Sequence, residues 1–171
     1  LWLLERLGAG SGVGNLGGAV RVRGRLDAGA FHDALRRLVL RHPALRLTFG
    51  EREGEPWQRV HERLEPGFEV VNAAGWSDGE LRERLQEEIH RPFDLVTGPP
   101  VRAVLWTGLS GDVLSLAVHH LVADLWSLTV LVRDLGALYD EADLPALEVS
   151  PLDVYAFQER RLAGPEGERL W

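Results

Sequence analysis

The sequence predicts an α/β domain in which a mixed sheet packs against helices. The period of the apolar residues switches repeatedly between two, typical of strands, and three to four, typical of helices. Helical and strand-like segments alternate along the chain instead of gathering in separate halves. The 171 residues, 45% of them apolar, are enough for one domain with a buried core.

A first helix is predicted from about Ala28 to His42. Asp27 can cap its amino end, and Pro43 ends it. The apolar residues of one face recur at steps of three and four, at Phe31, Ala34, Leu35, Leu38 and Val39. This pattern indicates an amphipathic helix.

Two further helices follow. Ser77 and Glu80 form a capping box for a helix that should end near His90, because Pro92 disfavours helix at the residue before it. A third helix begins at Leu125. Its predicted apolar face comprises Leu125, Leu128, Leu131, Val132, Leu135, Leu138 and Tyr139.

Strand-like segments fill the intervals. PVRAVLWTGL and VLSLAVHH, joined by a turn at SGD, predict a hairpin of buried strands. The other strand-like segments are AVRVRGRL, ALRLTF, WQRVHE and FEVVN. The terminal segments LWLLERL and SPLDVYAFQERRLAG are helix-like.

The glycine tract GAGSGVGNLGG contains the pattern G-x-G-x-x-G at Gly12, Gly14 and Gly17. A dinucleotide site needs a strand before this pattern and a helix after it. Here a helix-like run precedes the tract and a strand follows it. The order of the elements therefore favours a flexible connection over a phosphate-binding loop.

Charge and composition exclude several classes of function. The net charge of -7 argues against nucleic acid or an anionic membrane as the main partner, since both attract basic surfaces. The absence of cysteine excludes disulfides and thiolate metal sites and fits a reducing cytoplasm. No apolar stretch is long enough to span a membrane. Because the chain lacks methionine and begins within a helix-like run, we expect it to be an excerpt of a longer polypeptide.

The stretch VHHLVADLWS holds the strongest candidate site. Successive side chains of a strand point to opposite faces, so His119 and His120 cannot converge on one metal ion, and we expect no metal. The same alternation would bury one histidine and present the other at the strand end. An imidazole there can take a proton from an amine or alcohol that attacks an acyl group. Alternatively, one histidine is an ordinary core residue and Asp124 caps the helix from Leu125.

HHLVADLWS resembles the HHxxxDG active-site motif of the condensation domains of nonribosomal peptide synthetases, in the chloramphenicol acetyltransferase-like superfamily. RHPALRLTF resembles the second motif of that family, RHxxLRTxF, and LWLLERL is similar to the end of its first motif. RPFDLVTGPPVRAVLW and SPLDVYAFQERR resemble the segment before the active-site strand and the helix that closes the first half of the domain. The resemblance implies that residues 1–171 form the N-terminal lobe of a condensation domain, a two-layer lobe of mixed sheet and helices, and that the C-terminal lobe is absent.

The resemblance also implies amide bond formation. In the family, the α-amine of an aminoacyl group on one carrier protein attacks the thioester of an acyl or peptidyl group on another. His120 would be the catalytic residue at the reacting amine, as general base or as an anchor, and His119 would be the inward, structural histidine. Asp124 would pair with a buried arginine, for which Arg46 is the first candidate and Arg41 the second.

The implied partners are donor and acceptor carrier proteins, the C-terminal lobe, and adjacent adenylation and carrier domains. The 4′-phosphopantetheine of the carriers would enter as a substrate arm, and no bound cofactor is expected. The family's tunnel lies between two lobes, so this chain alone should fold but catalyse little or no condensation.

Two positions depart from the motifs. Leu125 stands where HHxxxDG has glycine, and Leu47 stands where the second motif has threonine. With Trp126 and Ser127, Leu125 is expected to line the substrate channel and to influence substrate preference. The alternative functions are those of a related acyltransferase that uses coenzyme A or a carrier, with an alcohol or amine as acceptor, and of a non-catalytic carrier-docking domain.

Overall fold

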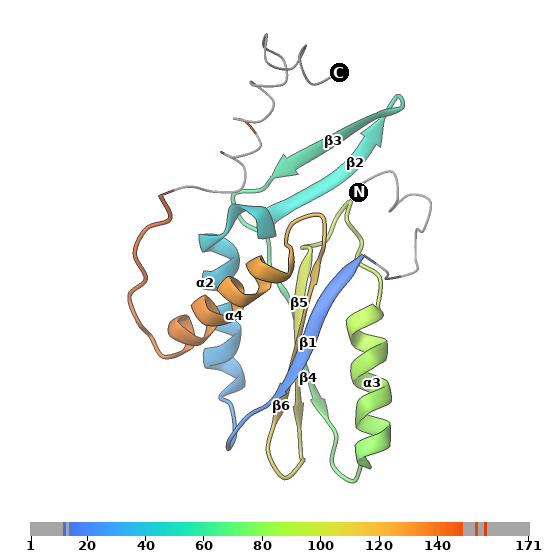
Figure 1. The fold of residues 1–171 in the computed structure, drawn as a ribbon, viewed down its shortest axis with the longest axis vertical. Coiled ribbons are helices and arrows are strands. Elements are labelled where there is room, and N and C mark those ends of the chain that lie inside the picture. The colour runs from blue at the N-terminus through green and yellow to red at the C-terminus, as the bar shows by residue number, and fades with distance from the viewer. Residues whose placement is uncertain (1–11, 13, 149–152, 154–155, 157–171) are drawn as a thin grey trace.

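The computed structural model describes residues 12, 14–148, 153 and 156. The elements in this part of the chain are, in order, β1 (Asn15–Arg21), α2 (Ala28–Arg41), the short 3₁₀ helix η1 (Pro43–Arg46), β2 (Leu47–Arg52), β3 (Glu55–Val60), β4 (Gly67–Asn72), α3 (Asp78–His90), β5 (Val101–Thr107), β6 (Val113–His119) and α4 (Leu125–Tyr139) (Figure 1). The helix-like segments predicted at residues 1–7 and 150–164 lie outside the described residues, apart from Asp153 and Ala156.

The main sheet has four strands in the order β1, β6, β5, β4. β6 runs antiparallel to both β1 and β5, whereas β4 runs parallel to β5. The predicted mixed sheet and the predicted hairpin of β5 and β6 are therefore confirmed. β2 and β3 form a separate antiparallel pair that projects beyond the end of the sheet (Figure 1).

Helices cover both faces of this sheet (Figure 1). α2 and α4 pack together on one face, where Leu35 and Leu131 share a core with Val118 of β6. α3 packs on the other face, where Leu81 contributes to a smaller core with Trp106 of β5. Two layers therefore describe the sheet with α2 and α4, and α3 adds a helix on the opposite face.

The helix starts follow the predicted caps. The Asp27 carboxylate accepts a hydrogen bond from the backbone N–H of Ala30 at 3.0 Å. The capping box of α3 is complete, because Ser77 N–H donates to the Glu80 carboxylate at 2.7 Å and Glu80 N–H donates to the Ser77 hydroxyl at 3.2 Å. All five residues predicted for the apolar face of α2 are buried.

β1 begins inside the glycine tract, earlier than predicted. A Cβ atom on Gly17 would lie only 2.6 Å from the carbonyl oxygen of Leu116 on β6. Glycine therefore allows β1 to lie against its partner strand at this point. The expectation of a flexible connection is wrong from Asn15 onward, because this part of the tract is paired in the sheet.

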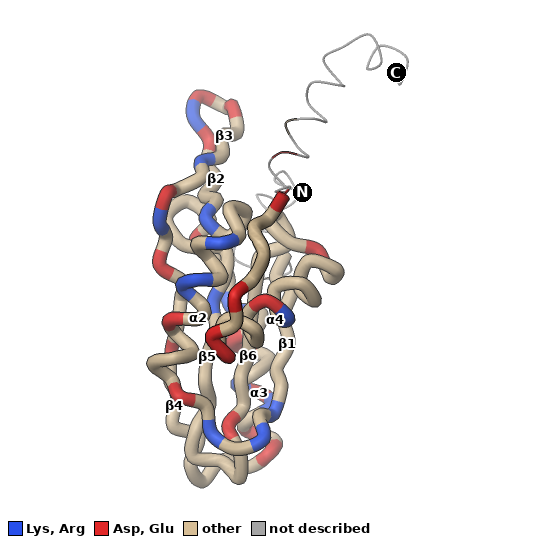
Figure 2. Tube along the Cα trace, turned by 90° about the vertical axis from the view of Figure 1, so that its left-hand side faces the viewer, with Lys and Arg blue, Asp and Glu red and all other residues tan. Residues whose placement is uncertain are grey.

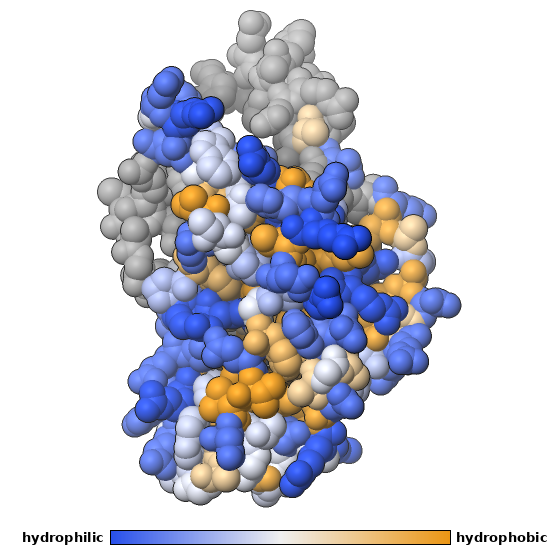
Figure 3. All heavy atoms as spheres, turned by 180° about the vertical axis from the view of Figure 1, so that it is seen from behind, coloured by the Kyte–Doolittle hydropathy of each residue, from blue (hydrophilic) through white to orange (hydrophobic). Residues whose placement is uncertain are grey.

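Polar and charged residues dominate the surface. Blue and red segments are interspersed along the chain in Figure 2, and Figure 3 shows apolar patches set among polar side chains. In the described part of the chain, no helix has the length and apolar character needed to cross a bilayer.

Candidate active site

The histidine pair stands at the end of β6. His119 is the last residue of that strand, pairs with Asn15 of β1 and is 2% exposed. Its backbone N–H donates to the Pro100 carbonyl at 2.9 Å, and its Nδ1 accepts from the Leu121 N–H at 3.2 Å. The Phe93 ring meets the imidazole edge-on, with the two ring centroids 6.1 Å apart. The structure thus places His119 inward and holds its ring.

His120 follows the strand and is exposed. Its backbone N–H donates to the carbonyl of Gly14 at 2.8 Å, which fixes it to the chain just before β1. Its Nδ1 lies 2.8 Å from the carbonyl oxygen of Ala123. A carbonyl oxygen can only accept, so Nδ1 carries the proton and, in the neutral imidazole, Nε2 holds the lone pair. The contact therefore fixes the ring orientation and the tautomer of His120, with the lone pair at Nε2.

Asp124 caps α4 directly after this turn. Its Oδ1 accepts hydrogen bonds from the Ser127 hydroxyl at 2.6 Å and from the Ser127 N–H at 2.7 Å. These bonds, the hydroxyl's first, hold the pKa of the Asp124 carboxyl below its ordinary range. Because Asp124 is bonded to Ala123, the cap also fixes the carbonyl that orients His120.

The prediction that Asp124 forms an ion pair with Arg46 or Arg41 is wrong. Within the described residues, neither Arg46 nor Arg41 reaches the Asp124 carboxylate. Arg46 donates instead to backbone carbonyls, from Nε to Val39 at 3.1 Å and from Nη1 to Glu62 at 3.2 Å. It lies in η1 and not in the strand predicted for ALRLTF, and from there its side chain closes the end of α2.

Arg41 belongs to a buried cluster around Asp134 of α4. The Asp134 side chain is 1% exposed, and its Oδ2 accepts from Arg41 Nε at 3.1 Å and from His42 Nε2 at 3.0 Å. Its Oδ1 accepts from Arg133 at 2.9 Å. Burial alone would raise the pKa of the Asp134 carboxyl, but the hydrogen bonds from these three side chains outweigh it and lower that pKa. The cluster joins the end of α2 to the middle of α4.

The residues expected to line the substrate channel form the first turn of α4. Leu125 and Trp126 are 75% and 79% exposed, and Ser127 is half-buried. The prediction that Leu125 and Val132 lie on the buried face is wrong. The buried stripe runs through Leu131, Asp134, Leu135 and Leu138, and both residues lie about a third of a turn away from it.

The buried charges on a strand and on a helix were not recognised from the sequence. Arg102 lies within the apolar strand VRAVLWT, and Asp134 lies on the apolar face of α4. A charged residue at a position where the pattern requires an apolar one needs a partner in the folded protein. Such an interruption of the apolar pattern is the signal in the sequence that could have identified both residues. Within the part of the chain that the structure describes, no three side chains form a possible metal site.

Comparison with known proteins identifies the family. The model of the family described as "Condensation domain" matches residues 1–168. The chain belongs to this family. It is 39% identical over 176 residues to a dimodular nonribosomal peptide synthase of Bacillus subtilis and 37% identical over 175 residues to the probable non-canonical nonribosomal peptide synthetase CymA of Salinispora arenicola. Each alignment covers 98% of this chain, but only 7% and 2% of those proteins.

Solved structures agree with the fold of this condensation domain chain. The X-domain from teicoplanin biosynthesis, solved in complex with OxyB, has a TM-score of 0.82 and 34% identity, and the match covers 98% of this chain and 37% of that one. The epimerization domain from the third module of tyrocidine synthetase B has a TM-score of 0.84 and 25% identity, covering 96% and 40% of the two chains. The predicted chloramphenicol acetyltransferase-like fold is thereby confirmed.

Proposed function

We propose that this chain is the N-terminal lobe of a condensation domain in a cytoplasmic nonribosomal peptide synthetase, and that His120 acts on the attacking amine. The observation that supports this most strongly is the hydrogen bond from His120 Nδ1 to the Ala123 carbonyl. It leaves the lone pair at Nε2, on an exposed side chain at the end of a rigid strand.

The proposed reaction joins two carrier-bound groups. The α-amine on the phosphopantetheine arm of the acceptor carrier attacks the thioester carbon of the donor. A C–N bond forms, the C–S bond breaks, and the donor arm leaves as a thiol. His120 Nε2 accepts the proton of the amine, or holds the amine by a hydrogen bond while the thiolate takes that proton. Positioning alone could supply much of the rate, because an α-amine with a pKa of about 8 is already partly neutral near neutral pH.

The second lobe remains a required partner in this proposal. The chain covers 37% and 40% of the two solved chains described above, so the other wall of the substrate tunnel would come from outside residues 1–171. We therefore expect the isolated chain to fold and to catalyse little or no condensation. The carriers and the adjacent adenylation domains are the further partners, and the phosphopantetheine arms are substrates.

A second candidate is a partner-binding domain without catalysis. The 34% identity to the X-domain, which was solved in complex with OxyB, favours it. The orientation of His120 favours the catalytic candidate, because a docking surface has no need of an exposed imidazole with a defined tautomer.

The test is reconstitution of the full two-lobed domain with two loaded carriers. The product should be an amide on the acceptor arm, detected by mass spectrometry of the intact carrier. Transfer from acyl coenzyme A to a free alcohol or amine, with no product on the carrier, would support the related acyltransferase instead. No product from any donor, in a folded domain, would support the partner-binding candidate.

A further inference from the structure

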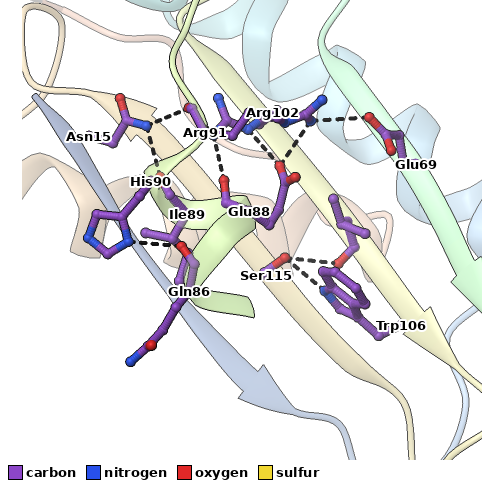
Figure 4. A network of polar contacts seen from close by, with 11 residues as sticks. Asn15, Glu69, Gln86, Glu88, Ile89, His90, Arg91, Arg102, Trp106 and Ser115 are labelled. Carbon is purple, nitrogen blue, oxygen red and sulfur yellow. Dashed lines mark hydrogen bonds and ion pairs between the residues drawn. The ribbon is translucent and has the colours of Figure 1, made fainter. Parts of the chain in front are cut away.

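Arg102 is a charged residue buried on β5. It is 5% exposed, and its Nε donates to the Glu88 carboxylate at 2.6 Å (Figure 4). Its Nη2 donates to the backbone carbonyls of Glu88 and Arg91. The last carbonyls of a helix lack partners within the helix, so the guanidinium closes the carboxyl end of α3.

The same guanidinium holds an aromatic ring against the inward histidine. The Arg102 Cζ atom lies 4.0 Å from the centroid of the Phe93 ring. That ring in turn meets the His119 imidazole edge-on at 6.1 Å. Arg102 pairs with Ala117, two residues before His119, so both side chains share one face of the sheet. One cation therefore fixes the position of the ring that packs on His119.

A second connection runs through β1. Asn15 Nδ2 donates at 2.7 Å to the carbonyl oxygen of Arg91, which Arg102 also reaches (Figure 4). The neighbouring residue, Gly14, accepts the backbone N–H of His120. The end of α3 is thus bonded both to the strand that bears Arg102 and to the segment that holds the backbone of His120.

We propose that Arg102 is a positioning residue for the histidine pair, acting through Phe93 and through the shared Arg91 carbonyl. This inference rests on the proposed function of His120. Because Arg102 is buried, we expect it to act without touching substrate, so its loss should slow the reaction step and leave carrier binding unchanged. A role in folding alone would change the amount of folded protein but not the His119 ring environment in the part that is folded.

The experiment compares Arg102→Gln with Arg84→Gln in the full two-lobed domain. Arg84 is the matched control, because it lies on the exposed side of α3 and pairs with the exposed Glu87 there. For Arg102→Gln we expect kcat per folded molecule to fall by about tenfold or more, KM for the loaded acceptor carrier to change by less than about twofold, and the ring signals of His119 to shift in ¹H–¹³C NMR spectra. Arg84→Gln should change none of these, and Arg102→Lys should restore part of the rate.

Phe93→Leu keeps the test decisive if Arg102→Gln does not fold. It removes the ring between the guanidinium and His119 but keeps an apolar side chain against the core, and it should reproduce the fall in kcat and the shift of the His119 signals. A folded variant of either kind with wild-type kcat, or with unshifted His119 signals, would overturn the proposal. If His120→Ala were fully active, the proposed function would fail, but the His119 signals would still decide whether Arg102 fixes that ring.

Discussion

His120 Nδ1 and the carbonyl oxygen of Ala123 lie 2.8 Å apart, and this contact orients the exposed imidazole. The residue after Ala123 is Asp124, whose carboxylate caps α4 through Ser127. The hydrogen bonds of this aspartate, which belongs to the HHxxxD motif, therefore go to the helix cap and not to the histidine, although the charge of Asp124 also interacts with His120. The cap fixes the turn that supplies the orienting carbonyl.

Replacing Asp124 by alanine should reduce condensation more than it reduces folding. The cap would be lost, the Ala123 carbonyl would move, and kcat should fall by about tenfold or more. Asp124→Asn keeps an acceptor for Ser127 and should retain most of the activity. Asp27→Ala is the matched control, since it removes the cap of α2. Equal kcat values for Asp124→Ala and Asp27→Ala, each per folded molecule, would contradict this role.

The cluster around Asp134 predicts a loss of stability on acidification. Burial lowers the pKa of His42 below its ordinary value of 6.5, so the unfolded chain binds this proton first and stability falls as the pH drops below that value. The pKa of the Asp134 carboxyl is also lowered, from an ordinary value of 3.8. The resulting stability is fully present above pH 3.8 and is lost as the pH falls through the pKa of the folded state.

Urea unfolding from pH 3 to pH 8 would measure both steps. His42→Gln can still donate to Asp134 but cannot titrate, so the upper step should disappear and the lower one should stay. If wild type and His42→Gln had parallel pH profiles, the assignment of the upper step to His42 would be wrong.

The sequence predicted the features that depend on nearby residues. The caps at Asp27 and Ser77 and the hairpin of β5 and β6 follow from a few adjacent positions, and the structure confirms them. The partners of Arg41 and Asp124 were wrong because they depend on how α2 docks on α4, which the local pattern does not specify. A buried charge breaks the apolar pattern, but the pattern does not say which residue faces it.

The burial of Leu125 was also predicted wrongly, for a different reason. The spacing of apolar residues does not show which of them face the core. Leu125 fits the helical spacing but lies on an exposed first turn of α4. The early start of β1 was missed because glycine normally weakens strands. Here its missing side chain is what permits the pairing.

Gly17→Ala and Gly18→Ala provide a direct comparison at neighbouring positions of β1. The methyl group at Gly17 would meet the Leu116 carbonyl, whereas nothing lies within 4 Å of the corresponding point at Gly18. We expect Gly17→Ala to lower the free energy of unfolding by about 1 to 3 kcal/mol and Gly18→Ala to change it by less than about 0.5 kcal/mol. Chemical denaturation measures both, and equal effects would show that β1 does not approach β6 as described.

Leu125→Ala should alter acceptor preference without altering stability. The side chain is 75% exposed, so its removal should change the free energy of unfolding by less than about 0.5 kcal/mol. Competition among carriers loaded with different amino acids would measure the preference. Val132→Ala is the control, since Val132 is also exposed on α4 but lies two turns further along. If Leu125→Ala kept the same order of preference among the loaded carriers, the prediction that Leu125 lines the substrate channel would be wrong.

The central claim is that His120 acts on the reacting amine. The most direct measurement is the single-turnover rate of amide formation by the two-lobed domain, with donor and acceptor carriers fully loaded, for wild type and His120→Ala. The exposed position of His120 predicts that the variant folds normally. We predict that the rate of the variant is lower than that of the wild type by about a hundredfold or more. An equal rate in the folded variant would contradict the claim.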